Sequence, residues 1–173
     1  AFNGCAELEH ITIPGSITTI GEWAFFNCCK LGEIAIPNSV TAVKREAFRG
    51  CSSLSSVTLP DSITTISNNL FVSCSKLENI TLPANITTIE FGAFYNCDNL
   101  KSITIPRGVK SIENGAFSNC DLLTKVVLPD SITTINNYTF WNCRELASII
   151  IPNRVDSIGY NEFAGCEKLK TII

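Results

Sequence analysis

Nine cysteines and one histidine are the residues of this 173-residue chain whose types suggest chemistry. Thiols and imidazoles together form zinc sites, and pairs of thiols form disulfides. The recurring cysteines never stand in a Cys-x-x-Cys pair, and a lone histidine, His10, argues against a zinc site. Eight of the cysteines instead recur at intervals of 23 residues, at Cys5, Cys28, Cys51, Cys74, Cys97, Cys120, Cys143 and Cys166.

This regular spacing favours a structural role for the eight thiols. Residues that repeat with one period stack in register, and parallel Cβ vectors at strand spacing orient two sulfurs poorly for a disulfide. We therefore expect eight buried, reduced thiols that pack as small hydrophobic groups, and no metal. Cys29 lies outside the period, in a column of mostly polar residues, and we expect it to be exposed. It either joins two chains or has no role, and the sequence leaves both open.

No set of catalytic residues is apparent. His10 occupies a variable position ahead of a predicted strand, which is typical of a solvated surface residue. A single histidine at such a position builds no Ser-His-Asp or Cys-His arrangement, and no acidic column recurs to supply paired carboxylates. We predict that the chain is not an enzyme and uses no cofactor.

Charge and hydrophobicity restrict the partners further. The net charge is −3, and lysines and arginines are scattered rather than clustered in the basic stripe that nucleic-acid binding needs. The longest apolar runs are only a few residues, so we expect no membrane insertion. The chain opens without a signal-peptide pattern, begins in mid-repeat and contains no methionine, so we expect a segment or processed product of a longer protein.

The whole chain follows the same 23-residue period. All seven prolines keep it, at Pro14, Pro37, Pro60, Pro83, Pro106, Pro129 and Pro152. A fixed period of this length predicts a repeat solenoid, in which each coil packs only on its neighbours. We predict one array over residues 1–173, of about seven and a half coils and without clear caps.

Each coil should contain two short strands and a turn. Apolar, mostly β-branched residues six and eight places after the cysteine alternate with an outward residue, and proline follows where pairing stops. These strands should stack as the main parallel sheet of a right-handed, mostly β coil. A second apolar pair, such as Ile63 and Ile66, predicts a shorter strand on another side.

The segment before each cysteine should form the turn. Its pattern, as in Glu22–Cys28, is long enough for one 3₁₀ or short α-helical turn around a recurring phenylalanine. The residue just before the cysteine is glycine or asparagine in seven of eight repeats, which predicts a left-handed backbone there. Ser73 is the exception, and it either adopts that conformation or changes the turn locally.

The columns read C-x-x-L-x-x-I-x-I-P-x-x-V/I-x-x-I-x-x-x-A-F-x-G/N, and this pattern resembles the BspA-like, or Treponema-type, leucine-rich repeat family over all of residues 1–173. The departures are few: Leu70, Thr139 and Glu162 replace the small residue before the phenylalanine. The resemblance implies a leucine-rich-repeat coil in a cell-surface or secreted protein. Members of the family act as adhesins or as modules that bind host and matrix proteins. No catalytic residue is implied, because the shared motif is structural.

Two surfaces are candidates for binding. The first is the outer face of the main sheet, predicted to be concave, with Thr12, Thr58, Thr81, Thr104, Val127 and Ile150. Its threonines suggest ice or carbohydrate binding, although strand propensity also explains them. The second consists of aromatic residues around the turn, which either anchor a partner or pack against the next coil: Trp23, Phe26, Tyr95, Tyr138 and Trp141, with Phe91 and Tyr160 nearby.

These features together predict a non-catalytic protein–protein recognition module, and the family resemblance implies that it is adhesin-like and placed at a cell surface or secreted. Its expected partner is a protein, such as a host or extracellular-matrix protein. The alternative is a structural role, in which coils with exposed edges at Phe2 and Ile173 associate end to end into filaments or a surface layer.

Overall fold

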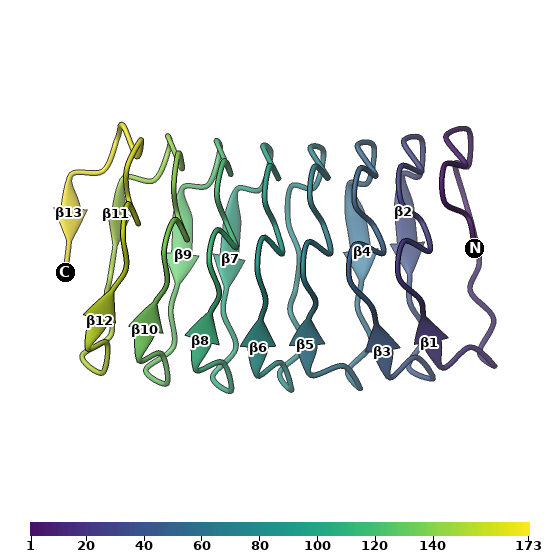
Figure 1. Ribbon diagram of the computed structural model, residues 1–173, viewed down its shortest axis with the longest axis horizontal. Coiled ribbons are helices and arrows are strands. Elements are labelled where there is room, and N and C mark those ends of the chain that lie inside the picture. Colours follow the sequence, from purple (N-terminus) through teal and green to yellow (C-terminus); the bar gives the residue numbers. More distant parts are fainter.

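The computed structural model describes residues 1–173 as a stack of coils along one axis, with the two termini at opposite ends (Figure 1). Residues 23 apart lie side by side, so that Ile34 pairs with Val57 and Ile66 pairs with Ile89. The predicted repeat solenoid is therefore confirmed. It is built from parallel strands.

The strands form two sets, which alternate along the chain on two sides of the coil. The first set precedes the prolines and comprises β2 (Glu33–Ala35), β4 (Ser56–Thr58), β7 (Ser102–Thr104), β9 (Lys125–Val127), β11 (Ser148–Ile149) and β13 (Thr171–Ile172). The second set follows them and comprises β1 (Thr19–Ile20), β3 (Ala42–Val43), β5 (Thr65–Ile66), β6 (Thr88–Ile89), β8 (Ser111–Ile112), β10 (Thr134–Ile135) and β12 (Ser157–Ile158).

The second set forms the more continuous ladder. It makes one five-stranded parallel sheet and the pair β1–β3, whereas the first set makes only the pairs β2–β4, β7–β9 and β11–β13. Between β4 and β7, a single bridge joins Asn79 to Ser102. Proline has no N–H to donate, so the first ladder cannot extend past the end of its short strands.

The third side of each coil contains no helix, so the expected 3₁₀ or α-helical turn is not confirmed. Its N–H groups point along the stack and donate to the carbonyl 22 residues later, as from Glu46 to Asn68 (3.0 Å), Phe48 to Leu70 (3.1 Å) and Gly50 to Val72 (2.8 Å). A helix would use these donors within its own turn. The turn instead contributes a third, regular set of hydrogen bonds between coils.

Two left-handed residues in each turn explain why no helix forms. The predicted one, just before the cysteine, is confirmed in all eight repeats, and Ser73 also adopts it with φ of 59°. A second one was not predicted. It lies four residues earlier, at Trp23, Glu46, Asn69, Gly92, Gly115, Tyr138 and Asn161. A positive φ interrupts a right-handed helix, because side-chain and carbonyl atoms approach too closely.

The core is a continuous stack of equivalent side chains. Phenylalanine rings form its spine from Phe2 to Phe163, with neighbouring centroids 5.3 to 5.8 Å apart and planes within 19° of parallel. The leucine three residues after each cysteine is fully buried from Leu31 to Leu146. Because each ring and leucine is covered from both sides, the interior coils bury more apolar surface than the end coils.

The cysteines join the coils by hydrogen bonds as well as by packing. The thiol of Cys74 donates to the carbonyl oxygen of Phe48 at 3.2 Å, and the N–H of Cys51 donates to the same oxygen at 3.1 Å. Equivalent thiol bonds of 3.0 to 3.2 Å occur in every coil from Cys28 to Cys166. Each phenylalanine carbonyl between residues 25 and 140 thus accepts one bond from its own coil and one from the next.

The expectation of eight buried thiols was wrong at both ends of the array. Cys5 is exposed and Cys166 is only half-buried, whereas the six between them are buried. No described coil lies ahead of Cys5 to cover it. Cys29 was expected to be exposed, but it is half-buried and its thiol lies 3.4 Å from the carbonyl oxygen of Asn27.

Candidate binding surfaces

The outer side chains of the first strand set form one candidate surface, here called the sheet face. Its predicted residues are all exposed, and Ile150, at 66%, is more open than Val127, at 41%. Thr58, Thr81 and Thr104 line a shallow hollow of about 950 Å³ that lies where the strand ladder is open between β4 and β7. Thr12 and His10 line a smaller neighbouring hollow, which Thr58 also lines.

The aromatic residues around the turns form the other candidate surface, here called the turn face. At its N-terminal end, arginines from the following coil cover the rings. The guanidinium carbon of Arg45 lies 5.3 Å from the ring centroid of Trp23, and that of Arg49 lies 5.9 Å from the centroid of Phe26. Both rings thus have a cation–π contact within the array, although Trp23 is still 41% exposed.

In the C-terminal part of the turn face, aromatic rings contact one another. Tyr138 meets Trp141 and Tyr160 edge-on, with centroids 6.5 and 5.9 Å apart. Tyr138 is 40% exposed, and Phe91, two coils away, is 52% exposed. No arginine lies over these rings, in contrast to Trp23 and Phe26.

A groove of about 440 Å³ runs between these aromatic residues. Gly92, Gly115 and Ser118 are among its lining residues, with Tyr95 and Phe91 toward one end and Tyr138 and Trp141 toward the other. Gly115 lies in the column that holds Asn69 and Tyr138 in other coils, so a missing side chain creates the space. The Ser118 hydroxyl donates to the Tyr138 carbonyl at 2.5 Å, which holds this small side chain inward.

The sequence singled out the aromatic residues of the groove but missed the small ones. Gly92 and Gly115 are consecutive glycines in one column, and Ser118 stands between Tyr95 and Trp141 in another. This pair of columns is the signal that would have located the groove. Reading it requires knowing that the two columns lie side by side on one face.

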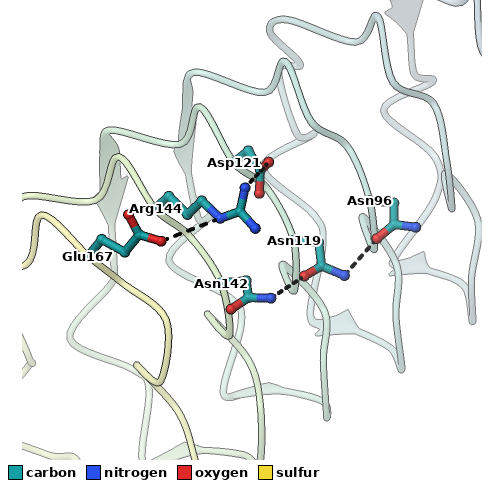
Figure 2. A network of polar contacts seen from close by, with 6 residues as sticks. All are labelled: Asn96, Asn119, Asp121, Asn142, Arg144 and Glu167. Carbon is teal, nitrogen blue, oxygen red and sulfur yellow. Dashed lines mark hydrogen bonds and ion pairs between the residues drawn. The ribbon is translucent and has the colours of Figure 1, made fainter.

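Polar ladders run beside the turn face (Figure 2). The side-chain amide of Asn142 donates to Asn119 at 3.0 Å, and that of Asn119 donates to Asn96 at 2.8 Å. In the neighbouring row, Arg144 lies between Asp121 and Glu167, at N–O distances of 3.4 and 3.8 Å. Exposed ion pairs of this kind contribute little stability each. The amide ladder and the backbone hydrogen bonds therefore contribute more to holding neighbouring coils in register.

Two carboxyl groups near this face have raised pKa values. Burial, and then the charge of Asp121, raise the pKa of Asp98. Burial raises the pKa of Glu162 to about 7, although a backbone N–H and the hydroxyl of Thr139 lower it. One carboxylate oxygen of Glu162 has no hydrogen-bond partner. Glu162 occupies a column that mostly holds alanine, so its carboxyl group replaces a methyl group in the core.

The remaining reactive groups show no arrangement for chemistry. Burial raises the pKa of the Cys51 thiol to about 12 and that of Cys166 to about 11, so both are protonated at neutral pH and are poor nucleophiles. No cluster of three or more His, Cys, Asp or Glu side chains could hold a metal ion. The structure contains no helix with the length and apolar character needed to cross a membrane.

The comparisons with known proteins agree with this architecture. The profile of the BspA type leucine-rich repeat region matches residues 1–122 and 88–173, in six copies. The chain belongs to the BspA-type leucine-rich repeat family. The family and the fold are those of repeat proteins, consistent with a protein-binding module. No curated protein matches the chain in sequence.

Three solved structures illustrate the family fold. A leucine-rich repeat protein from Bacteroides ovatus is 39% identical, with a TM-score of 0.88 over 91% of this chain and 41% of its own. A leucine-rich cell surface protein from Faecalibacterium prausnitzii is 38% identical, with a TM-score of 0.84 over 90% and 42%. The T. pallidum leucine-rich repeat protein is 32% identical, with a TM-score of 0.85 over 89% and 72%. The chain therefore spans about two fifths of the length of the first two.

Proposed function

We propose that this chain is a non-catalytic protein-recognition module of a cell-surface or secreted protein, and that it acts as an adhesin toward a host or extracellular-matrix protein. Family membership supports a protein-binding repeat. The similar protein from Faecalibacterium prausnitzii, which is described as a cell surface protein, supports the location. The partner binds on the turn face.

The observation that carries this assignment is the open aromatic groove. Tyrosine and tryptophan are the residues that most often anchor protein interfaces, because they bury large area with few rotatable bonds. Tyr138, Trp141 and Tyr95 line this groove without a covering arginine. The hollow of the sheet face is larger but has a more polar lining, with fewer candidates for such anchors.

The test is a binding screen of the whole chain against extracellular-matrix and host-surface proteins, with one variant on each face. Tyr138→Asn is matched to Asn69 and Asn161, which hold the same column with φ of 53° and 57°. Thr104→Ala is matched to Ala35 in the column of the sheet face. We expect Tyr138→Asn to weaken binding of the captured protein about tenfold or more, the range of an interface hot spot, and Thr104→Ala to change it less than about twofold.

The opposite ranking of the two variants would move the binding site to the sheet face. If no protein binds the chain, the assignment as an adhesin is wrong.

Self-association is the second candidate function. Phe2 at one end of the described array and Ile172 and Ile173 at the other are exposed apolar residues that stacking of two copies would cover. Light scattering across a dilution series separates the two functions. A recognition module stays monomeric, whereas a filament former shows large species that dissociate on dilution.

A further inference from the structure

The array itself shows which chemical group covers aromatic residues on the turn face. Arg49 stands 23 residues after Phe26 and lies over its ring, and Arg45 from the same coil lies over Trp23. Both aromatic columns thus accept a guanidinium group from the next coil, held by ion pairs to Glu46 and Glu22.

The equivalent positions at the groove are not basic. The residues 23 places after Tyr95 and Trp141 are Ser118 and Ala164, whose side chains are too short to cover a ring. The groove therefore leaves two aromatic residues without the arginine that the same column has elsewhere. Its volume of about 440 Å³ leaves room for an extended side chain.

The groove has no free positive charge that would repel a cation. Its one charged lining residue, Arg49, is already paired with Glu46 at 3.2 Å. The faces of tyrosine and tryptophan rings attract a guanidinium or ammonium group.

We propose that the groove between Tyr95 and Trp141 binds an arginine side chain from a basic segment of the protein partner. The arginine lies over an aromatic ring of the groove as Arg49 lies over Phe26. This inference rests on the proposed function and names the partner chemistry of the same face.

The test uses the whole ¹⁵N-labelled chain and the blocked peptide acetyl-Gly-Arg-Gly-Arg-Gly-amide. The chain has two tryptophans, so its two indole N–H signals report on Trp23 and Trp141 separately, and Trp141→Ser assigns them. The control peptide carries citrulline, which keeps the shape of arginine without its charge. We expect the arginine peptide to shift the Trp141 signal saturably, and citrulline to bind about fivefold more weakly or worse.

Two variants at one exposed position sharpen the test. Ala164→Arg places a guanidinium over Trp141 as Arg49 does over Phe26, whereas Ala164→Gln adds length without charge. Ala164→Arg should weaken peptide binding about fivefold or more, and Ala164→Gln should change it less than about twofold. The spectra of both variants also show that they fold. Trp141→Ser removes the reporting indole, so its effect is read on the backbone amide signals of Gly92 and Gly115, which should no longer shift with the peptide. Ser118 holds the same column in a neighbouring coil.

Three results would overturn the inference: equal binding of the citrulline peptide, a shift confined to Trp23, or no shift at millimolar peptide. Each is distinguishable from failure of the proposed function. A matrix protein that binds through Tyr138 while the arginine peptide does not would leave recognition intact and remove only its arginine chemistry. If the arginine peptide binds but no matrix or host protein does, the arginine site stands and the proposed recognition function falls.

Discussion

The sheet face and the turn face belong to the same repeat but are held together differently. On the sheet face the strands pair only in twos, and a hollow of about 950 Å³ lies where the ladder is open. On the turn face, three backbone N–H groups per coil reach the next coil, and the phenylalanine stack and the thiol bonds lie directly behind them. The side with the aromatic residues is therefore bonded more regularly from coil to coil.

This difference bears on recognition. A surface that is already ordered loses little conformational entropy on binding, so more of the contact energy appears as affinity. The turn face holds Tyr95, Tyr138 and Trp141 on backbone that is bonded to both neighbouring coils. The four predictions below test whether the two faces differ as described.

The largest effect should come from the spine behind the turn face. Phe94 is fully buried, with its ring 5.4 Å from that of Phe71 and 5.3 Å from that of Phe117. Phe94→Ala removes a ring that both neighbours contact, so we expect a loss of about 3–5 kcal/mol in the free energy of unfolding, measured by urea denaturation. Phe91→Ala, at a 52% exposed position in the same turn, should cost less than about 1 kcal/mol. Equal losses would mean that the stack does not support the coil.

The second effect concerns the buried carboxyl group of Glu162. Its folded pKa of about 7 lies above the ordinary value of 4.5, so the folded state binds more protons than the unfolded state between these values. This contribution to stability is fully present below about pH 4.5 and is lost as pH rises through 7. Glu162→Gln should remove this pH dependence, and should raise the free energy of unfolding at pH 8 relative to pH 4 by roughly 3 kcal/mol compared with the parent chain. Parallel pH profiles for the two proteins would contradict it.

The third effect tests the thiol bonds. Cys97→Ala removes the donor that Phe71 accepts at 3.2 Å and leaves a small cavity, so we expect a loss of about 1–3 kcal/mol by urea denaturation. The control is Cys29→Ala, since that thiol is half-buried and makes only a 3.4 Å contact, and it should change stability by less than about 0.5 kcal/mol. If Cys97→Ala leaves the free energy of unfolding unchanged, the thiol hydrogen bond adds no stability.

The two faces also differ in how far the sequence predicts them. The in-register columns, the buried leucine column and the left-handed residue before each cysteine follow from the 23-residue period and from residue type. The conformation of the turn does not follow from the period or from residue type. Its N–H groups bond to residues 22 places away, whereas local propensity favours a helix there. The groove was missed for a related reason: Gly115 and Ser118 make it by leaving space between neighbouring columns.

The smallest effect should come from the sheet face. Thr58, Thr81 and Thr104 are exposed, and Thr81 lies beside a single bridge rather than within a strand pair. Valine keeps the shape of threonine without the hydroxyl, and Val127 already occupies this column. The triple Thr→Val variant should therefore change the free energy of unfolding by less than about 0.5 kcal/mol per site and leave binding of a matrix protein unchanged. Ice or carbohydrate binding through this threonine row requires the opposite result, since both depend on the hydroxyl groups, and an activity of either kind that disappears in the variant would make the sheet face the functional one.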